Sequence, residues 1–255
     1  MLLRLLVLAY GLAGYALFLA TFVYAVGFVG GFLTPTRLDG PREGSLLAAV
    51  ATDLGLLAVF AVQHSGMARP AFKRWLTRYV PVAAERATYC VLSCAALLLM
   101  FALWRPLGGV VWDTDGAARV VMYAAFAAGW LIVLWTTFLI DHFDLFGLRQ
   151  VVLFARGRPY PPARFVTPGP YRWVRHPLYV GWLTVFWAAP TMTAAHLLFA
   201  AGTTAYILIA VVLEERDLSA AHPEYEAYRA RVPMFVPRLR RTRPLIETRR
   251  NEVTP

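Results

Sequence analysis

Five long stretches without a charged side chain constrain what this chain can fold into. They cover residues 5–33, 45–62, 87–104, 120–140 and 177–213, and only Asp53 interrupts them. A helix that crosses a bilayer needs roughly 20 mostly apolar residues, so each of the first four stretches predicts one membrane-spanning helix. The fifth has 37 residues and is broken at the sequence APTMTAAH. It predicts a helical hairpin that turns near Pro190 and has a short first arm.

The composition supports this interpretation. Charged residues make up 16% of the chain and hydrophobic residues 59%, whereas a soluble domain has about 25% charged residues. We therefore predict an all-α, polytopic integral membrane protein with four single spans and a C-terminal helical hairpin. Residues 1–237 are expected to form one domain, and residues 238–255 a basic flexible tail with little to bury. A cleaved signal peptide is the alternative for the first stretch, but its 29 uncharged residues exceed the apolar region of such peptides.

The positive charges lie mostly on one side of the predicted bundle. If the N-terminus is placed on side B, side A holds only four of the 25 lysines and arginines, namely Arg37, Arg42, Arg105 and Arg119. Cytoplasmic loops carry an excess of these residues, so side B and both termini are expected in the cytoplasm. A basic surface there also suits anionic lipid headgroups. Because the basic residues follow the membrane edges and the tail, nucleic-acid binding is not expected.

Ionisable side chains gather at four helix ends on side B. Ionisable groups at membrane depth are costly, and they are functional candidates by default. The alternative for each residue is that a helix end simply becomes polar where it leaves the lipid. The residues are His64, Asp141, His142, Asp144, Arg172, Arg175, His176, Glu214 and Glu215.

The two ends of the hairpin carry charges that its helix dipoles disfavour. Arg175 and His176 precede Pro177, which suits the first position of a helix, and cations are disfavoured beside a helix N-terminus. Glu214 and Glu215 lie at the negative end of the second arm. Pairing with neighbouring ions of opposite charge is one resolution. The other is a ligand with a carboxylate at one end and hydroxyls or an ammonium at the other, as in S-adenosylmethionine.

Two other features leave alternatives open. Asp53, inside the second stretch, is either a buried structural residue or part of the lining of a cavity. Residues 222–237 read HPEYEAYRARVPMFVP and predict a short helix followed by extended chain. Tyr225 and Tyr228, with Arg229 beside them, either cover an adenine ring or seal the domain onto the bilayer. The five histidines lack the spacing typical of a metal site, so no metal is expected.

The last third of the chain, residues 164–237, resembles a family of integral membrane methyltransferases. The sequence RHPLYVGW is followed by a hydrophobic hairpin, by EER and by HPEYEAYRARVPMFVP. This pattern is similar to that of isoprenylcysteine carboxyl methyltransferases and phospholipid methyltransferases, in which the corresponding motifs enclose S-adenosylmethionine in a cytoplasmic cap. The resemblance implies a cofactor site formed by Val166, Tyr171, Arg175, His176, Tyr179, Glu214, Glu215, Tyr228 and Arg229.

The rest of the chain is similar to the bacterial methanethiol S-methyltransferases, relatives of the NnrU proteins. The sequences QHSGMARPAFKRW, VPVAAERATY, LWRPLGGVVW and LIDHFDLFGLRQV carry this resemblance. It implies an enzyme of the bacterial inner membrane that methylates a small volatile thiol, methanethiol, to dimethyl sulfide. Alternative acceptors are another thiol, an isoprenoid carboxylate or a phospholipid amine. More distant alternatives are a non-catalytic NnrU-like membrane protein, a transporter and a membrane reductase.

Methyl transfer to a thiol needs a group that takes up the thiol proton, because the thiolate is the nucleophile. Asp141, His142 and His64 are the candidates, since all three end helices on the side of the expected cofactor site. A histidine with its usual pKa of about 6.5 acts as a base at neutral pH, and a carboxylate can orient it. We hypothesise that Asp141 pairs with His142 or with His64.

Overall fold

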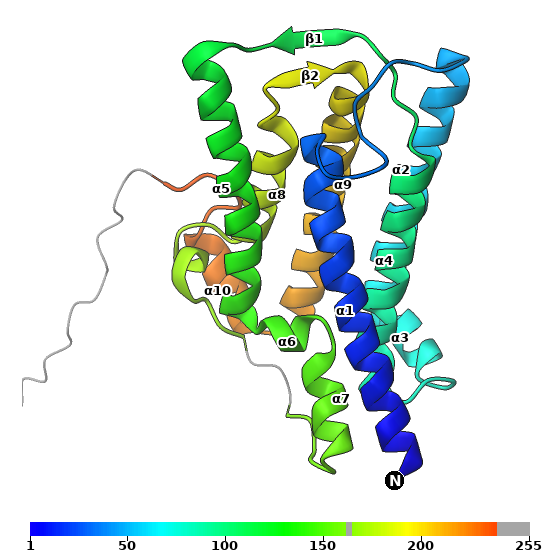
Figure 1. Ribbon diagram of the computed structural model, residues 1–255. Coiled ribbons are helices and arrows are strands. Elements are labelled where there is room, and N and C mark those ends of the chain that lie inside the picture. Colours follow the sequence, from blue (N-terminus) through cyan, green and yellow to red (C-terminus); the bar gives the residue numbers. More distant parts are fainter. Residues whose placement is uncertain (162–164, 239–255) are drawn as a thin grey trace, which may run out of the picture.

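The apolar stretches form helices because a backbone in lipid satisfies its N–H and C=O groups only through internal hydrogen bonds. The computed structural model describes residues 1–161 and 165–238. Within them, five helices are long and apolar enough to cross a membrane. They are α1 (Leu2–Gly30), α2 (Leu46–Ala68), α4 (Glu85–Leu103, preceded by the turn η1, Val82–Ala84), α5 (Gly116–Ile140) and α9 (Ala194–Ala221) (Figure 1). The prediction of an all-α polytopic membrane protein is confirmed. Residues 239–255, most of the expected tail, lie outside the described residues.

The C-terminal hairpin has unequal arms, as the sequence predicted. Its first arm, α8 (Pro177–Trp187), has 11 residues, whereas α9 has 28. The turn between them contains β2 (Thr191–Thr193), which pairs antiparallel with β1 (Val110–Asp113) from the loop before α5. The hydropathy pattern did not predict this small sheet. The Trp112 indole also donates a hydrogen bond to the Ala189 carbonyl (3.1 Å), so the hairpin turn is tied to the loop that precedes α5.

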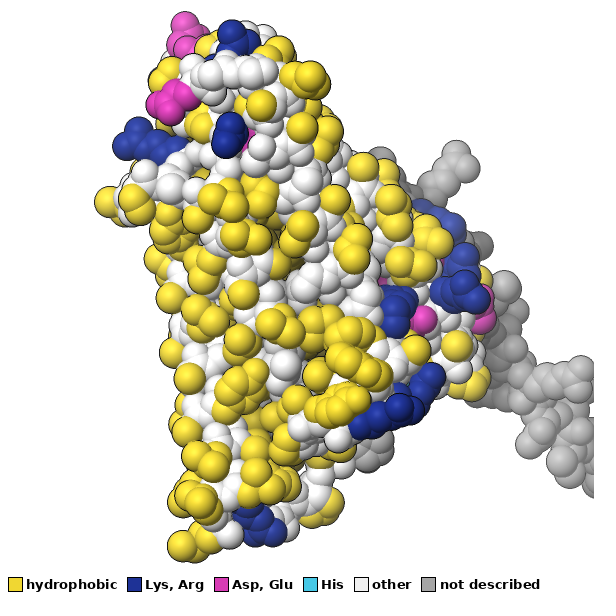
Figure 2. All heavy atoms as spheres, turned by 90° about the vertical axis from the view of Figure 1, so that its right-hand side faces the viewer, with side chains coloured by type: hydrophobic (Ala, Val, Ile, Leu, Met, Phe, Trp, Pro, Cys, Tyr) yellow, Lys and Arg dark blue, Asp and Glu magenta, His cyan; other side chains and the backbone are white. Residues whose placement is uncertain are grey.

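The two ends of the bundle differ in their chemistry. One end, here called the strand face, carries β1 and β2. The other, here called the basic face, carries the N-terminus and the short helices α3 (Pro70–Leu76), α6 (His142–Leu145), α7 (Leu148–Ala155) and α10 (Glu224–Arg231) (Figure 1). On the flank shown in Figure 2, hydrophobic side chains predominate, and charged side chains lie toward the ends and one edge. This distribution is the one expected of a helix bundle surrounded by lipid.

Aromatic packing and one buried carboxylate hold α1, α2 and α4 together near the strand face. Phe28 packs on Phe101 with ring centroids 4.6 Å apart. The Trp104 indole donates a hydrogen bond to a carbonyl in the loop after α1 (3.2 Å). Asp53 is fully buried, and its Oδ1 accepts a hydrogen bond from the backbone N–H of Arg105 (2.9 Å). Asp53 therefore ties α2 to the end of α4, which is the structural alternative that the sequence left open.

Helices α5 and α8 cross at two glycines, where their backbones touch. A β-carbon on Gly129 would lie 3.1 Å from the carbonyl oxygen of Gly181, and one on Gly181 would lie 3.0 Å from the carbonyl oxygen of Gly129. Small residues allow such close approach, and the resulting van der Waals contacts stabilise helix pairs in membranes. The crossing fixes α8, whose N-terminus follows Arg175 and His176, and it thereby positions the site described below.

Replacing Gly181 by valine is expected to separate α8 from α5, because a β-carbon there would also lie 2.9 Å from a methyl group of Val133. Overpacking of this kind costs about 1–3 kcal/mol. We expect the thermal unfolding midpoint of the detergent-solubilised protein to fall by roughly 2–10 °C. Gly55→Ala is the control, since a β-carbon at Gly55 meets nothing within 4 Å. An unchanged midpoint in Gly181→Val would contradict the close crossing.

Candidate functional site

A cavity of about 700 Å³, here called the main cavity, lies on the basic face. Its walls come from segments far apart in the sequence: the end of α5 and α6, residues 160–161 and 165–171, the start of α8, the end of α9, and α10. Pockets that bind cofactors and other small molecules have volumes of roughly 300–1,000 Å³. The main cavity therefore has the size needed for a ligand as large as a nucleoside derivative.

Both ends of the hairpin contribute to this cavity. Seven of the nine residues implied as cofactor-binding line it, whereas Glu215 and Arg229 do not. The seven are Val166, Tyr171, Arg175, His176, Tyr179, Glu214 and Tyr228. The structure therefore brings together residues that are about 40 positions apart in the sequence.

The charges that the helix dipoles disfavour are paired with one another. Glu215 Oε1 accepts a hydrogen bond from Arg175 Nε (2.7 Å) and lies 2.8 Å from His176 Nε2. Arg229 Nε lies 3.4 Å from the other oxygen of Glu215. The side chains of Arg175 and Glu215 are only 9% and 5% exposed. The sequence left open whether these charges pair with neighbouring ions or with a ligand, and the structure shows pairing within the protein.

The chain after α10 closes over the start of α8. The backbone N–H groups of Arg175 and His176 donate to the carbonyls of Pro233 (2.8 Å) and Met234 (3.2 Å). Arg175 Nη1 also donates to the carbonyl of Val232 (2.6 Å). The donors of Arg175 are thus engaged by Glu215 and by backbone carbonyls, so its guanidinium serves as a structural tie between the hairpin and the segment after α10.

Of the two neighbouring carboxylates at the end of α9, Glu214 is the one that lines the main cavity. Tyr179 donates a hydrogen bond to its Oε2 (2.9 Å) and thereby orients the carboxylate. An ionised carboxylate has several lone-pair positions and no donor of its own. Glu214 is therefore placed to accept hydrogen bonds from the hydroxyl or ammonium groups of a ligand.

Aromatic rings form another part of the wall. Phe165 lies edge-on to Tyr225 and Tyr228, with ring centroids 5.7 and 5.5 Å apart. The Tyr228 hydroxyl donates to the Tyr171 carbonyl (2.6 Å). Burial raises the pKa of Tyr228 to about 12, and it also raises the pKa of Tyr171 and of Tyr225 above the usual value. These phenols stay neutral at physiological pH and form an uncharged surface suited to a planar base.

The segment after α5 carries a charged cluster that lines the same cavity. Asp141 has φ 107°, in the left-handed region, and its carboxylate accepts the backbone N–H of Asp144 (3.1 Å), which begins α6. Arg149 Nη1 lies 2.5 Å from Asp141 Oδ2. Asp144 accepts hydrogen bonds from the Tyr160 hydroxyl (2.8 Å) and from Arg86 (3.2 Å). The cluster ties α6 and the start of the loop after α7 to α4.

His142 lies outside the wall of the main cavity. Its side chain is 2% exposed, its Nε2 lies 2.9 Å from the Tyr15 hydroxyl, and its Nδ1 lies 2.8 Å from Thr137 Oγ1. Burial lowers the pKa of His142, so the ring is neutral at pH 7. Both ring nitrogens are engaged away from Asp141, so the expected Asp141–His142 contact does not form.

His64 also lies outside that wall. Its Nε2 lies 2.8 Å from the Tyr89 hydroxyl and its Nδ1 lies 3.2 Å from Ser93 Oγ. The expected contact with Asp141 does not form either, because Asp141 binds Arg149 instead. Among residues 1–161 and 165–238, no group of three or more His, Cys, Asp or Glu side chains is arranged to hold a metal ion.

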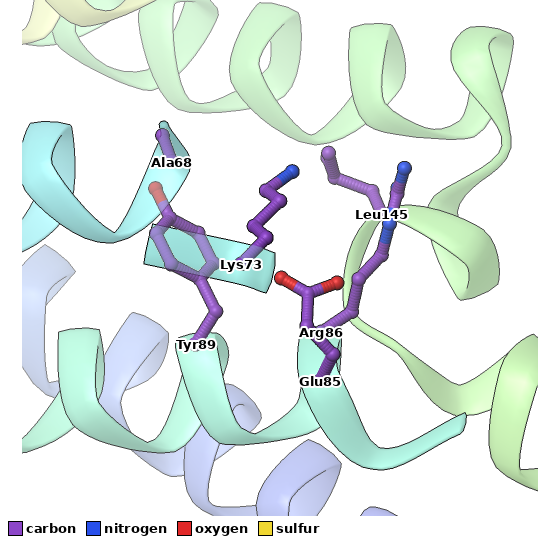
Figure 3. A pocket seen from close by; sticks show the side chains of 6 residues that line it. All are labelled: Ala68, Lys73, Glu85, Arg86, Tyr89 and Leu145. Carbon is purple, nitrogen blue, oxygen red and sulfur yellow. The ribbon is translucent and has the colours of Figure 1, made fainter. Parts of the chain in front are cut away.

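A second chamber of about 70 Å³, here called the side chamber, lies beside the first. It shares Arg86 and Leu145 with the main cavity. In Figure 3, Lys73 and Glu85 point toward the space between Tyr89 and Leu145. The remaining wall residue is the last of α2, so α2, α3, α4 and α6 all contribute to the chamber.

Part of the wall could not be found by sequence reasoning. Arg86 and Arg149 lie within sequences that carry the family resemblance, but nothing local indicates that they face a cavity. Tyr160 and Phe165 lie in the loop between α7 and α8, where no periodic pattern distinguishes an inward side chain. Among the wall residues that were not predicted, only Tyr225 had a sequence signal for a place at the site, namely its spacing of three residues from Tyr228.

Comparisons with known proteins place the chain among membrane methyltransferases. Residues 150–217 match the isoprenylcysteine carboxyl methyltransferase (ICMT) family. The methanethiol S-methyltransferase of Crocosphaera subtropica is 53% identical over 236 residues, 92% of each chain. That of Mycobacterium tuberculosis is 51% identical over 236 residues, 92% of this chain and 97% of its own. Nurim of Sus scrofa is 33% identical over 187 residues, 69% of this chain and 71% of its own. No solved structure matches the chain.

Replacing Arg175 by alanine is expected to destabilise the protein, because it leaves the buried Glu215 without its closest cation. Breaking a buried ion pair on one side costs about 3–5 kcal/mol. We expect the thermal unfolding midpoint in detergent to fall on the order of 10 °C. Arg172→Ala, an exposed arginine on the same segment, is the matched control and should change stability by less than about 0.5 kcal/mol. Equal midpoints for the two variants would show that the buried pair does not hold the hairpin.

Proposed function

Because this chain belongs to the methanethiol S-methyltransferase family, we propose that it transfers a methyl group from S-adenosylmethionine to the sulfur of methanethiol. The products are dimethyl sulfide and S-adenosylhomocysteine. The observation that carries the proposal is the identity of 53% over 92% of the chain to a protein with that activity in its name. The main cavity supports it, since both ends of the hairpin line a space of about 700 Å³.

The residues in the wall fit S-adenosylmethionine. The neutral rings of Phe165, Tyr171, Tyr225 and Tyr228 suit an adenine base, and Glu214 is placed to accept hydrogen bonds from ribose hydroxyls or from the ammonium group. Val166 and Tyr179 complete the same wall. When bound, the cofactor supplies a methyl group on a positively charged sulfur. The protein has mainly to position this group against the acceptor.

Four of the implied cofactor residues, Arg175, His176, Glu215 and Arg229, contact one another and form the frame of the site. Arg175, His176 and Arg229 all contact Glu215 and hold the start of α8 against α9 and α10. This frame keeps Glu214, the neighbour of Glu215, directed toward the cavity. We propose that these four residues support cofactor binding by fixing the wall.

Asp141, His142 and His64 remain the proposed candidates for the group on which the thiol proton finally resides. Asp141 lies on the main cavity, but Arg149 binds its carboxylate at 2.5 Å. His142 is enclosed by the protein, as described above. His64 is connected through Tyr89 to the side chamber.

The protein is a multi-pass membrane protein, and we propose that its basic face lies in the cytoplasm of a bacterium, with the strand face outside the inner membrane. The positive-inside rule supports this orientation. It places the main cavity on the side where S-adenosylmethionine is made.

Replacing Glu214 by glutamine is expected to weaken binding of S-adenosylhomocysteine about 10- to 100-fold. A hydrogen bond to a charged group contributes about 1.5–3 kcal/mol, and each 1.4 kcal/mol is about tenfold in affinity. Isothermal titration calorimetry of the purified protein measures the change. Glu43→Gln is the control, because Glu43 is exposed near the strand face. Unchanged affinity in Glu214→Gln would remove Glu214 from the cofactor site.

The acceptor is tested with purified protein, labelled S-adenosylmethionine and four acceptors: methanethiol, a larger thiol, an isoprenoid carboxylate and a phosphatidylethanolamine vesicle. We expect labelled dimethyl sulfide from methanethiol, with turnover at least tenfold above that of every other acceptor. If cofactor binding occurs but another acceptor is preferred, the methyltransferase assignment stands and the methanethiol proposal fails.

A further inference from the structure

The side chamber differs from the main cavity in size and chemistry. Its volume of about 70 Å³ is one tenth of that of the main cavity. A water molecule needs at least about 10–15 Å³ on the same measure, so the side chamber accommodates a molecule of a few heavy atoms. A nucleoside does not fit there, whereas a molecule with one carbon and one sulfur does.

We propose that the side chamber binds the thiol acceptor and that Tyr89 takes up the thiol proton. This inference rests on the function proposed above. The chamber shares Arg86 and Leu145 with the main cavity, so a sulfur atom in it lies next to the space assigned to the cofactor. Proximity of this kind is the first requirement for transfer between two bound reactants.

The contacts of Tyr89 give it a route for the proton. Its ring lines the side chamber, and its hydroxyl lies 2.8 Å from His64 Nε2. The other ring nitrogen of His64 lies 3.2 Å from Ser93 Oγ, and Phe60 stacks on the imidazole with ring centroids 5.1 Å apart. If Nδ1 carries the hydrogen and donates to Ser93, Nε2 accepts from the Tyr89 hydroxyl. The lone pairs of the Tyr89 oxygen are then available to accept a proton from a thiol.

The charges around the side chamber favour the thiolate. Lys73 and Arg86 both line it, and nearby cations lower the pKa of a thiol. Glu85 lies in the same wall and balances part of this charge. Arg86 is also paired with Asp144. A small sulfur compound in the chamber therefore meets these two cations, the carboxylate of Glu85, and the hydroxyl of Tyr89 that leads to His64.

The proposed step conserves atoms and electrons. The S–H bond of the thiol breaks, its proton goes to the Tyr89 oxygen, and the proton of Tyr89 moves to His64 Nε2. The electron pair left on sulfur forms the new S–C bond while the bond between the sulfonium and its methyl group breaks. That second electron pair stays on the sulfur of the departing thioether. Tyr89 is the catalytic residue that contacts the thiol in this step, and His64 receives the proton through Tyr89 without contacting the thiol.

Tyr89→Phe tests the proposal, because it removes the hydroxyl and keeps the ring. We expect dimethyl sulfide release at pH 7 to fall about 100-fold or more, the scale on which general acid–base groups contribute. The loss should shrink by about tenfold per pH unit as the pH rises toward the pKa of the free thiol, because the thiolate then forms without a base. His64→Gln should show the same pH dependence. Binding of S-adenosylhomocysteine should stay within twofold of the parent.

Tyr10→Phe is the matched control for the loss of a hydroxyl. Tyr10 donates to Thr88, the residue before Tyr89 on α4, and lines neither cavity. Its activity should equal that of the parent at every pH. Asp141→Asn and His142→Gln are measured alongside, and a pH-dependent loss in either of them with normal activity in Tyr89→Phe would overturn the proposal.

Ala68→Leu tests the location of the acceptor independently of the proton route. Ala68 lines the side chamber but not the main cavity. A larger side chain at this position therefore fills the chamber and leaves the main cavity unchanged. We expect KM for methanethiol to rise at least tenfold with unchanged S-adenosylhomocysteine binding. This variant also decides the matter if Tyr89→Phe loses its cofactor binding through misfolding.

The outcomes separate this inference from the proposed function. An active parent with Tyr89→Phe within threefold of it, or with a loss that does not change with pH, overturns the role of Tyr89. An unchanged KM in Ala68→Leu overturns the acceptor chamber. A parent that binds S-adenosylhomocysteine but does not methylate methanethiol overturns the proposed function, and this inference with it.

Discussion

The contact of Glu215 with Arg175 and His176 is the interaction on which the rest of the site depends. It joins the end of α9 to the start of α8, which are the two ends of a hairpin whose arms have very different lengths. These three side chains are buried, and unpaired buried charges are costly, so pairing them is a condition for burying them at all. Once they are paired, Glu214 on α9 and Tyr179 on α8 come within hydrogen-bond distance. The part of the main cavity wall that the hairpin contributes depends on this contact.

Most of the architecture could be predicted from the sequence, because lipid imposes a simple rule on the backbone. Each of the first four apolar stretches became one helix, the fifth became the hairpin of α8 and α9, and the break near Pro190 marked its turn. The pairing of β1 with β2 could not be predicted, since only a few residues are involved and neither segment shows a strand pattern. The role of Asp53 was also out of reach, because its partner is a backbone N–H that lies 52 positions away.

The sequence was less informative about which polar side chains face the cavity. It identified the hairpin ends, because motif spacing there reflects a contact between two helices. It did not predict the direction of His142, since the left-handed backbone of Asp141 turns the chain between α5 and α6 without a glycine to signal it. That turn stacks His142 on Phe138, with ring centroids 4.1 Å apart, so that Asp141 lines the cavity and His142 does not. Proximity in sequence at a helix end therefore did not mean proximity in the site.

Backbone contact between α5 and α8 at Gly129 and Gly181 leaves α8 no freedom to tilt on that side. Any widening of the main cavity for a ligand of nucleoside size is therefore expected at another wall. That wall is α10 and the chain before α8, joined through the Tyr228 hydroxyl and the Tyr171 carbonyl. If the proposed cofactor binds in this cavity, we expect its exchange with solvent to involve the opening of this polar cap.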